Sequence, residues 1–112
     1  MIVFHVTEAR NLRDINAYGV DPEFSQGKIK ASWWVVGNRL AWAIAHVCNR
    51  HHVTPDQVVI LPALIEDKLL VATCYPGVFY IREVVYLQGR LSPKCGSEYL
   101  TADDRLPEPG NV

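Results

Sequence analysis

The sequence lacks the features that would place it in a specialised class of protein. Its three cysteines are odd in number and widely spaced, so we expect no disulfide framework. No apolar run approaches the roughly 20 residues that a membrane-spanning helix needs. No charged-then-apolar leader opens the chain, so we expect a cytoplasmic protein with no membrane partner. The net charge of -1, from 11 basic and 12 acidic residues, gives no overall attraction to nucleic acid.

The length of the chain bounds its organisation. With 112 residues it can bury a single hydrophobic core, and its hydrophobic fraction of 49% is typical of a globular protein. Glycine and proline become frequent from Gly89 onward, among polar neighbours. We therefore expect a single compact domain over residues 1–92 and an irregular, partly disordered tail over residues 93–112.

The opening residues predict a strand that leads directly into a helix. Residues 2–6 are rich in β-forming side chains, and alternation places His5 on the face opposite its neighbours. Thr7 is a suitable N-cap, and Glu8 puts negative charge in the first turn, so we expect the helix to begin at Glu8. Gly19 should end it, because glycine accepts the positive φ found just past a last turn.

The next segment, residues 20–30, has no sustained period and contains Pro22 and Gly27, which indicates an ordered loop over one edge of the domain. Its two lysines, Lys28 and Lys30, could meet a phosphate or could keep the loop soluble. Loops of this length often carry function, because a rigid scaffold can hold a recognition surface on them.

Aromatic and β-branched residues at positions 31–36 predict a short strand. Trp33 and Trp34 are adjacent, so they must point to opposite faces, and one can enter the core while the other lines a surface or cleft. Asn38 is a suitable N-cap for a helix over residues 39–50. The wide apolar stripe of that helix predicts that it lies across the sheet.

Potential metal ligands gather at the end of this second helix, at His46, Cys48, His51 and His52. A structural zinc site needs about four ligands, usually from two elements, and no matching cysteine or histidine pair follows. We therefore expect no metal. Cys48 is interpreted as a small buried hydrophobic residue.

The second half of the chain adds further strands. Residues 58–61 form an apolar run typical of a central strand, which Pro62 should end. Residues 62–74 fit either a hairpin or a short helix. Residues 78–87 predict a long strand in which Glu83 falls in an otherwise apolar row. Such a carboxylate normally has a partner, faces a cleft, or lies where a bulge or strand end reaches water, so Glu83 is either an edge-strand carboxylate paired with a nearby arginine or part of a site.

These elements together predict an α+β fold with a small mixed, mostly antiparallel sheet and two helices. The opening, with His5-Val6-Thr7, Asn11-Leu12, Ile15 and Gly19-Val20, resembles the start of the DNA-targeting ADP-ribosyltransferase toxins. In those proteins a His-x-Thr strand runs into a helix of the form Asn-Leu-x-x-Ile that ends at a glycine. The rest of the chain is similar in the order of its elements, so the resemblance implies an ADP-ribosyltransferase-like fold.

The resemblance also implies roles for individual residues. His5 would hydrogen-bond a ribose hydroxyl of NAD, and Trp33 or Trp34 would stack on the nicotinamide where tyrosine is more usual. Glu83 would bind the 2′-hydroxyl of the nicotinamide ribose and stabilise the positive charge that develops there, as a carboxylate does in glycoside cleavage. Thr7 belongs to the same motif as His5.

A residue that would bind the phosphates of NAD is less evident in the sequence. Arg10 is the candidate that we assign to NAD, and Arg13 is a second one near the first helix. No residue two positions before Glu83 supports that carboxylate, since the position is occupied by Ile81. The resemblance is therefore fuller for the opening of the chain than for its late strand.

The implied activity is cleavage of the nicotinamide–ribose bond and transfer of ADP-ribose to an acceptor, either nucleic acid or protein, or hydrolysis of NAD. The alternative is a non-catalytic binding or accessory module on the same scaffold, which recognises a partner through residues 21–30 and the exposed tryptophan. The enzyme requires His5 and Glu83 to converge on one cleft, whereas the binding module buries His5 against a backbone carbonyl. The oligomeric state stays open, because the tryptophans could also anchor an interface.

Overall fold

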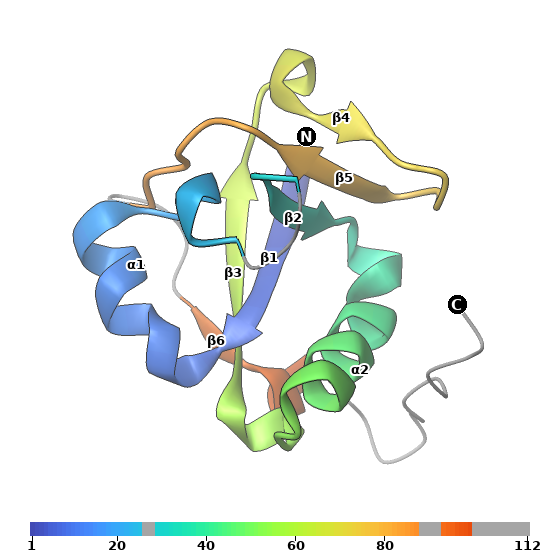
Figure 1. Cartoon of the computed structure of the whole chain (residues 1–112). Coiled ribbons are helices and arrows are strands. Elements are labelled where there is room, and N and C mark those ends of the chain that lie inside the picture. Colours follow the sequence, from blue (N-terminus) through green and yellow to red (C-terminus); the bar gives the residue numbers. More distant parts are fainter. Residues whose placement is uncertain (26–28, 88–92, 100–112) are drawn as a thin grey trace.

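The computed structural model of the chain describes residues 1–25, 29–87 and 93–99 (Figure 1). In these ranges six strands form one sheet of order β4-β5-β2-β1-β3-β6, in which every neighbouring pair is antiparallel. The strands are β1 (Ile2–Glu8), β2 (Ser32–Val35), β3 (Val58–Leu64), β4 (Val71–Ala72), β5 (Val78–Ile81) and β6 (Lys94–Cys95). The α-helices are α1 (Leu12–Tyr18) and α2 (Leu40–His51). The expected α+β class with two helices is confirmed. The sheet was expected to be mixed and mostly antiparallel, and every described pair is antiparallel.

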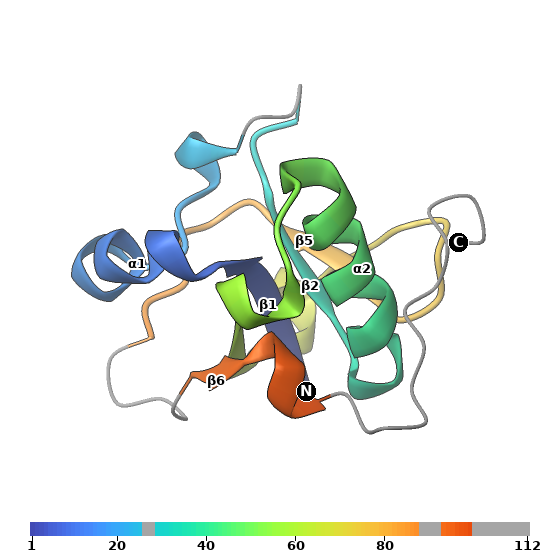
Figure 2. The same ribbon diagram turned by 90° about the horizontal axis from the view of Figure 1, so that it is seen from below.

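The two helices pack against opposite faces of the sheet (Figure 2). On the face toward α1, the core is built from Val3, Trp34, Leu61, Ala63, Ile81 and their neighbours, against which Leu12 and Ile15 of α1 pack. On the face toward α2, the core is built from Val35, Ile60 and Val78 together with Leu40, Ala43 and Ile44 of α2. We call these the α1 face and the α2 face. Alternation along each strand assigns every sheet residue to one of them.

The first helix begins later than the sequence indicates. Strand β1 stays paired with β3 as far as Glu8, which lies opposite Val58, so Thr7 and Glu8 remain extended. A 3-10 turn, η1 (Ala9–Asn11), separates the strand from α1. The prediction that Thr7 caps a helix starting at Glu8 is therefore wrong, because strand pairing outweighs the local capping preference.

The end of α1 at Gly19 is confirmed. Gly19 has φ 79°, which L side chains rarely adopt, and a Cβ added there would lie 2.7 Å from the carbonyl oxygen of Val85. Directly after it, Val20 forms an antiparallel bridge with Val85. This bridge fastens the end of α1 to the chain that follows β5.

The second helix also follows directly on a 3-10 segment, η3 (Gly37–Arg39), which joins β2 to α2. Asn38 lies inside η3, and the residue at the N-cap of α2 is Arg39, so the prediction of an Asn38 cap is wrong. The helix ends at His52, which adopts a left-handed conformation with φ 55°. The predicted strand and helix are otherwise present, with β2 shorter than residues 31–36 by one residue at each end.

Strand β3 continues through Pro62 to Leu64, and the prediction that Pro62 ends it is wrong. Its ladder with β1 is continuous across the pair Phe4 and Pro62, which indicates that the proline nitrogen faces away from β1. On that other side β6 pairs only with Val59 and Ile60, so the missing N–H removes no ladder hydrogen bond in the described sheet.

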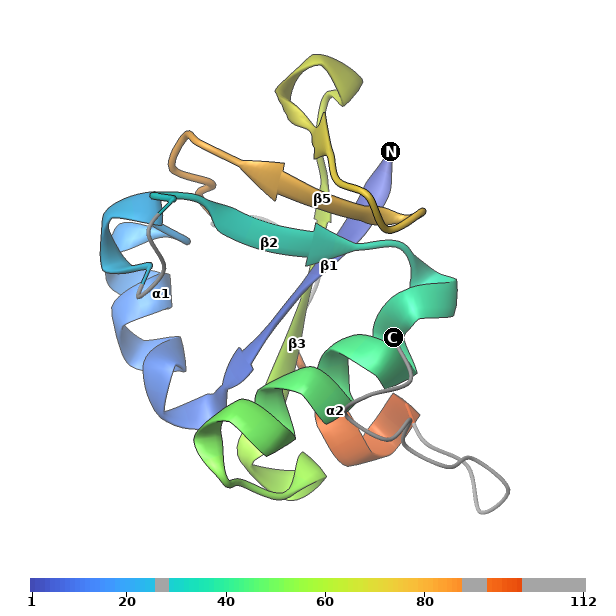
Figure 3. The ribbon, with the colours of Figure 1, turned by 45° about the vertical axis from the view of Figure 1, so that its right-hand side comes forward.

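Residues 62–74, for which the sequence allowed either a hairpin or a short helix, contain both a 3-10 turn and a strand. A 3-10 turn, η5 (Asp67–Leu69), precedes β4, and β4 forms an antiparallel hairpin with β5 (Figure 3). Strand β5 ends at Ile81, so the prediction of a strand over residues 78–87 is wrong beyond that point. Because Val85 pairs with Val20, the chain has left the sheet and crosses toward α1.

Part of the predicted tail is ordered. Residues 94–99 form β6 and a 3-10 turn, η6 (Gly96–Tyr99), where the sequence predicted irregular structure. The remainder of the predicted tail, residues 100–112, lies outside the described residues, as do residues 88–92 at the end of the predicted domain. Neither α-helix in the described part of the chain has the length and apolar character needed to cross a membrane.

Candidate functional site

His5 lies on β1 and faces the α1 side of the sheet. Its Nδ1 is 2.8 Å from the carbonyl oxygen of Trp33, and its ring centroid is 5.2 Å from that of Trp34. The ring is half-buried, and loss of hydration lowers the pKa of His5 although the bond to the carbonyl partly opposes this. A carbonyl can only accept, so Nδ1 carries the proton and Nε2 of the neutral ring is an acceptor. Within the described residues, Nε2 has no hydrogen-bond partner.

The two tryptophans point to opposite faces, as alternation predicts. Trp34 is completely buried on the α1 face, and its Nε1 donates to the Ser32 hydroxyl at 2.8 Å. Trp33 lies on the α2 face and is 46% exposed. The exposed indole and His5 are therefore on opposite sides of β2 and β1. Trp34 supports the His5 ring, but its own ring is covered.

Glu83 follows β5 in an exposed bend and makes no ion pair with any described residue. It does not lie in a buried apolar row, because the strand has already ended at Ile81. Its place along the sheet is set by the register of β2 and β5, in which Ser32 is opposite Ile81. Strands β1 and β2 share one described register pair, Phe4 with Val35, so the register places Glu83 beyond the end of the β2–β5 pairing but not in a row with Thr7.

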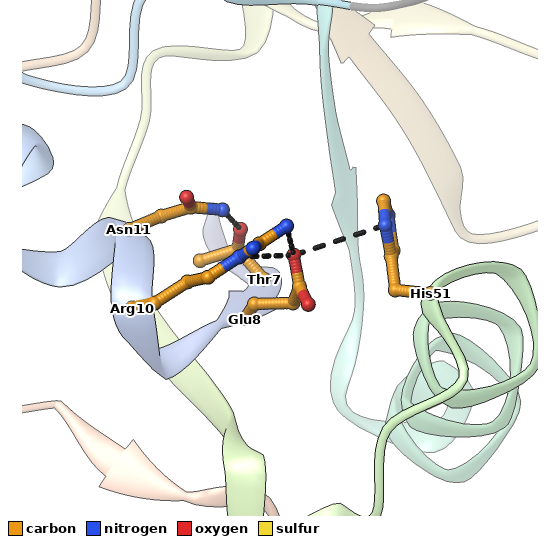
Figure 4. A network of polar contacts seen from close by, with 5 residues as sticks. All are labelled: Thr7, Glu8, Arg10, Asn11 and His51. Carbon is orange, nitrogen blue, oxygen red and sulfur yellow. Dashed lines mark hydrogen bonds and ion pairs between the residues drawn. The ribbon is translucent and has the colours of Figure 1, made fainter.

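A network of polar contacts surrounds the end of β1 (Figure 4). Glu8 is 7% exposed, and its Oε2 accepts from Nε of Arg10 at 3.0 Å and lies 3.0 Å from Nη2 of the same guanidinium. The Glu8 carboxylate is also 3.8 Å from Nδ1 of His51, at the end of α2. Beside this group, Asn11 donates from Nδ2 to the Thr7 hydroxyl at 3.0 Å.

This network uses residues that the sequence assigned to other tasks. Glu8 was expected to interact with a helix dipole, and Arg10 to hold a phosphate, yet the two form a partly buried ion pair. The alternation of side chains along β1 could have predicted this pairing. Glu8 follows Phe4 and Val6 at two-residue spacing and therefore points toward the α2 face. Arg13, the second candidate for a phosphate, is exposed.

The histidines and cysteine near the end of α2 do not come together. In the described part of the chain, no three His, Cys, Asp or Glu side chains are grouped so that they could hold a metal ion. His46 stacks on Trp42 with ring centroids 5.6 Å apart, and burial, with the nearby charges of Arg50 and His51, lowers the pKa of His46. Cys48 is half-buried, which raises the pKa of its thiol.

A surface hollow of about 400 Å³ lies away from His5, where β2 leads into α2. Its walls are Val36, Asn38, Arg39, Pro76 and Gly77. The Arg39 side chain crosses this hollow and donates from Nε to the carbonyl oxygen of Pro76 at 2.8 Å. His5 and Glu83 therefore do not open into it.

Comparison with known proteins gives no relative: no family model, curated protein or solved structure matches the chain. The site is accordingly defined by its own geometry. It comprises a half-buried neutral histidine on the central strand β1, a threonine on the same face, and a solvent-exposed carboxylate that follows β5.

Proposed function

We propose that the chain is an ADP-ribosyltransferase-like protein that binds NAD at the α1 face and cleaves its nicotinamide–ribose bond. The observation that carries the proposal is the half-buried His5 on β1, whose Nδ1 is held by the Trp33 carbonyl, with Thr7 on the same face of that strand. Glu83 follows β5, which is separated from β1 in the sheet by β2. ADP-ribose would pass to an acceptor on a nucleic acid or protein, or to water. NAD is the substrate, and the reaction needs no metal.

The state of His5 supports its role toward a sugar. Its Nδ1 is held by the Trp33 carbonyl at 2.8 Å, which fixes the tautomer and leaves Nε2 to accept from a ribose hydroxyl. Burial favours the neutral ring, so this acceptor persists at neutral pH. The Thr7 hydroxyl accepts from Asn11 and therefore retains its own proton for donation to the same ligand.

Glu83 supplies the charge that the chemistry requires. When the bond between nicotinamide nitrogen and ribose carbon breaks, its electron pair leaves with nicotinamide and the ribose gains oxocarbenium character. A carboxylate beside the 2′-hydroxyl stabilises that charge, and the acceptor then bonds to the same carbon and loses a proton. Arg10, 76% exposed at its side chain, can offer the rest of its guanidinium to a phosphate while it remains paired with Glu8. Neither tryptophan is needed as a stacking platform in this arrangement.

The test is a titration with NAD followed by an assay of nicotinamide release. Because Trp34 lies 5.2 Å from His5, we expect NAD to quench tryptophan fluorescence, with the quenching retained in Trp33→Phe and lost in His5→Ala. Glu83→Gln should lower the rate of nicotinamide release by about a hundredfold or more while NAD still binds. Glu98→Gln, at another exposed carboxylate, is the matched control and should leave the rate unchanged. Unchanged release in Glu83→Gln would contradict the proposal.

A second candidate is a non-catalytic binding module, and it is favoured by one specific observation. The bond from His5 to the Trp33 carbonyl is also what a purely structural histidine would make. In that case NAD would neither quench fluorescence nor release nicotinamide, and His5→Ala would lower the free energy of unfolding without changing any activity. The same titration therefore separates the two functions.

A further inference from the structure

The α2 face of the sheet carries a row of side chains that α2 leaves uncovered. Register aligns Trp33 of β2 with Tyr80 of β5, and Tyr80 with Val71 of β4, so the three cross the sheet side by side. Arg82 follows Tyr80 by two residues and continues on the same face. We call these four residues, Trp33, Val71, Tyr80 and Arg82, the aromatic ledge. Trp33 is 46% exposed and Val71 is 38% exposed.

The ledge is preorganised by its own contacts. The ring centroids of Trp33 and Tyr80 are 5.6 Å apart. The guanidinium carbon of Arg82 lies 5.4 Å from the Tyr80 ring centroid, and Nη2 donates to the Tyr80 hydroxyl at 3.4 Å. With no described carboxylate paired to Arg82, its charge is held in place by an aromatic ring and stays available to a partner.

The position of α2 explains why the ledge is open. The helix packs over Val35 and Val78, the next residues along β2 and β5 on this face, and over β1 and β3. One flank of the helix turns toward the β4–β5 hairpin, because Trp42 contacts Tyr75 with ring centroids 5.9 Å apart and stacks on His46. The ledge therefore extends from the helix flank to β4, the outer strand of the sheet on this side. Figure 3 shows the course of β2 and β5 beside α2.

The elements around the ledge contain no acidic residue. Between Glu23 and Asp56, and again between Asp67 and Glu83, the sequence has no aspartate or glutamate. These two stretches contain all of β2, α2, β4 and β5, and their charged residues are Lys28, Lys30, Arg39, Arg50, Lys68 and Arg82. The carboxylate that reaches the α2 face from β1 is Glu8, which is buried and paired with Arg10. Lys68 is paired with Glu66 at 3.1 Å, and Glu83 follows Arg82 directly, so the charge on the ledge itself is that of Arg82.

We propose that the aromatic ledge is a docking surface for an acidic, extended segment of a partner protein. Tryptophan, tyrosine and arginine are the residue types that contribute most to protein interfaces, and the positive charge of Arg82, beside strands that contain no acidic residue, complements a negatively charged partner. The ledge also ends at β4, the outer strand of the described sheet, whose free edge can pair with an added strand. Such a segment would place apolar side chains on Trp33 and Val71 and a carboxylate on Arg82.

Two other occupants fit less well. Nucleobases need open ring faces, but Tyr80 already has Trp33 and Arg82 against its ring, which leaves Trp33 alone to stack. A second copy of the chain docking through the same face would bring two cationic surfaces together. Both are nevertheless distinguishable from the proposed partner by experiment.

The test uses a fluorescent peptide of alternating glutamate and valine, with a lysine–valine peptide and an oligothymidylate of similar length as comparison probes. We expect the acidic peptide to bind, more weakly as salt rises, and the two comparison probes not to bind. Trp33→Ala and Arg82→Gln should each weaken binding by about tenfold or more. Tyr18→Ala and Arg13→Gln, exposed residues of the same types on α1, are matched controls and should leave binding unchanged.

Several results would overturn the proposal. Failure of the acidic peptide to bind, or equal binding by Trp33→Ala, removes the ledge as its docking surface. Binding of oligothymidylate that depends on Trp33 and Arg82 assigns the surface to nucleic acid, and self-association that Trp33→Ala abolishes assigns it to a second copy. Circular dichroism checks that each variant is folded. His5→Ala should leave peptide binding intact, so this proposal stands or falls independently of the NAD site.

Discussion

The two faces of the sheet differ in how completely they are covered, and the difference does not follow the size of the helices. The seven-residue α1 has no buried residue, yet the face beneath it buries Trp34, Val3 and Ile81 completely. The twelve-residue α2 buries Leu40, Ala43, Ile44 and Ala45, yet its face leaves Trp33 46% exposed. The α1 face is closed by Val20 and Val85, which bridge across it. Burial here depends on long-range crossings of the chain more than on helix length.

The largest expected effect separates the two adjacent tryptophans. Trp34→Ala should lower the free energy of unfolding by about 3–5 kcal/mol, because it leaves a large cavity in the α1-face core. Trp33→Ala should cost about 1 kcal/mol or less, because half of its ring is already in water. Urea denaturation of both variants measures the contrast, and equal losses would show that the faces are equally buried.

The bridge that closes the α1 face can be broken at Gly19. Gly19→Ala should destabilise the fold by about 2 kcal/mol, because φ is 79° and the new Cβ would meet the Val85 carbonyl at 2.7 Å. Gly37→Ala is the matched control on the other face, where the added Cβ would lie 3.9 Å from Phe4, an ordinary contact. Thermal unfolding should show a larger loss of stability for Gly19→Ala than for Gly37→Ala. If Gly19→Ala leaves stability unchanged, the Val20–Val85 bridge is not the cause of burial on the α1 face.

Weakening the contacts of Glu8 with Arg10 and His51, which join the ends of β1 and α2, should have an intermediate effect on the free energy of unfolding. Glu8→Gln should lower the free energy of unfolding by about 1–2 kcal/mol, because a buried acceptor loses its charge beside Arg10. Glu66→Gln removes the exposed pair with Lys68, whose nitrogen is 3.1 Å from the carboxylate, and should cost less than about 0.5 kcal/mol. Chemical denaturation compares the pair, and similar losses would indicate that burial of Glu8 adds nothing.

The histidines on the two faces predict a pH dependence of stability. Burial lowers the pKa of both His5 and His46 below the ordinary value of 6.5, so the unfolded chain binds protons more readily than the folded one. Stability should be fully present above pH 6.5 and should fall as pH decreases toward the lowered values. His5→Gln and His46→Gln should each flatten this dependence in denaturation curves recorded at several pH values. If His5→Gln leaves the dependence of stability on pH unchanged, His5 has the same pKa in the folded and the unfolded protein.

The smallest effect is expected where an aromatic donor is already unpaired. Trp42 Nε1 is buried and has no hydrogen-bond partner in the described structure, so Trp42→Phe should change the free energy of unfolding by less than about 1 kcal/mol. Trp34→Phe should cost more, because it removes the bond to Ser32 as well as packing volume. A Trp42→Phe variant that loses as much as Trp34→Phe would indicate a partner for this N–H.

Local patterns predicted the features that depend on a few neighbouring residues. Alternation separated Trp33 from Trp34, and the conformational freedom of glycine placed the end of α1 at Gly19. The extension of β1 through Glu8 could not be read in this way, because it depends on pairing with β3, fifty residues later in the chain. The exit of the chain after Ile81 likewise depends on Val20, and this exit is what exposes Glu83.

The sequence named residues for the candidate site but contained no information on how they are arranged. His5, Thr7 and Glu83 were named from the opening motif and a single carboxylate in an apolar run, and these patterns contain no information on which strand lies beside which. Arg10 was assigned to a phosphate because its pairing with Glu8 and the approach of His51 arise only when the ends of β1 and α2 meet. The aromatic ledge has the same origin, since Trp33, Tyr80 and Val71 come from three separate strands.

Pro62 lowers the capacity of one edge of the described sheet to pair with an added strand. Past Ile60, β3 has no described partner opposite β1, and there the proline nitrogen cannot donate to an incoming strand. At the other edge, β4 contains no proline and its two residues can pair. Within the described residues, the stretch of β3 beyond Ile60 is therefore a poorer template for an added strand than β4, because it lacks one backbone donor.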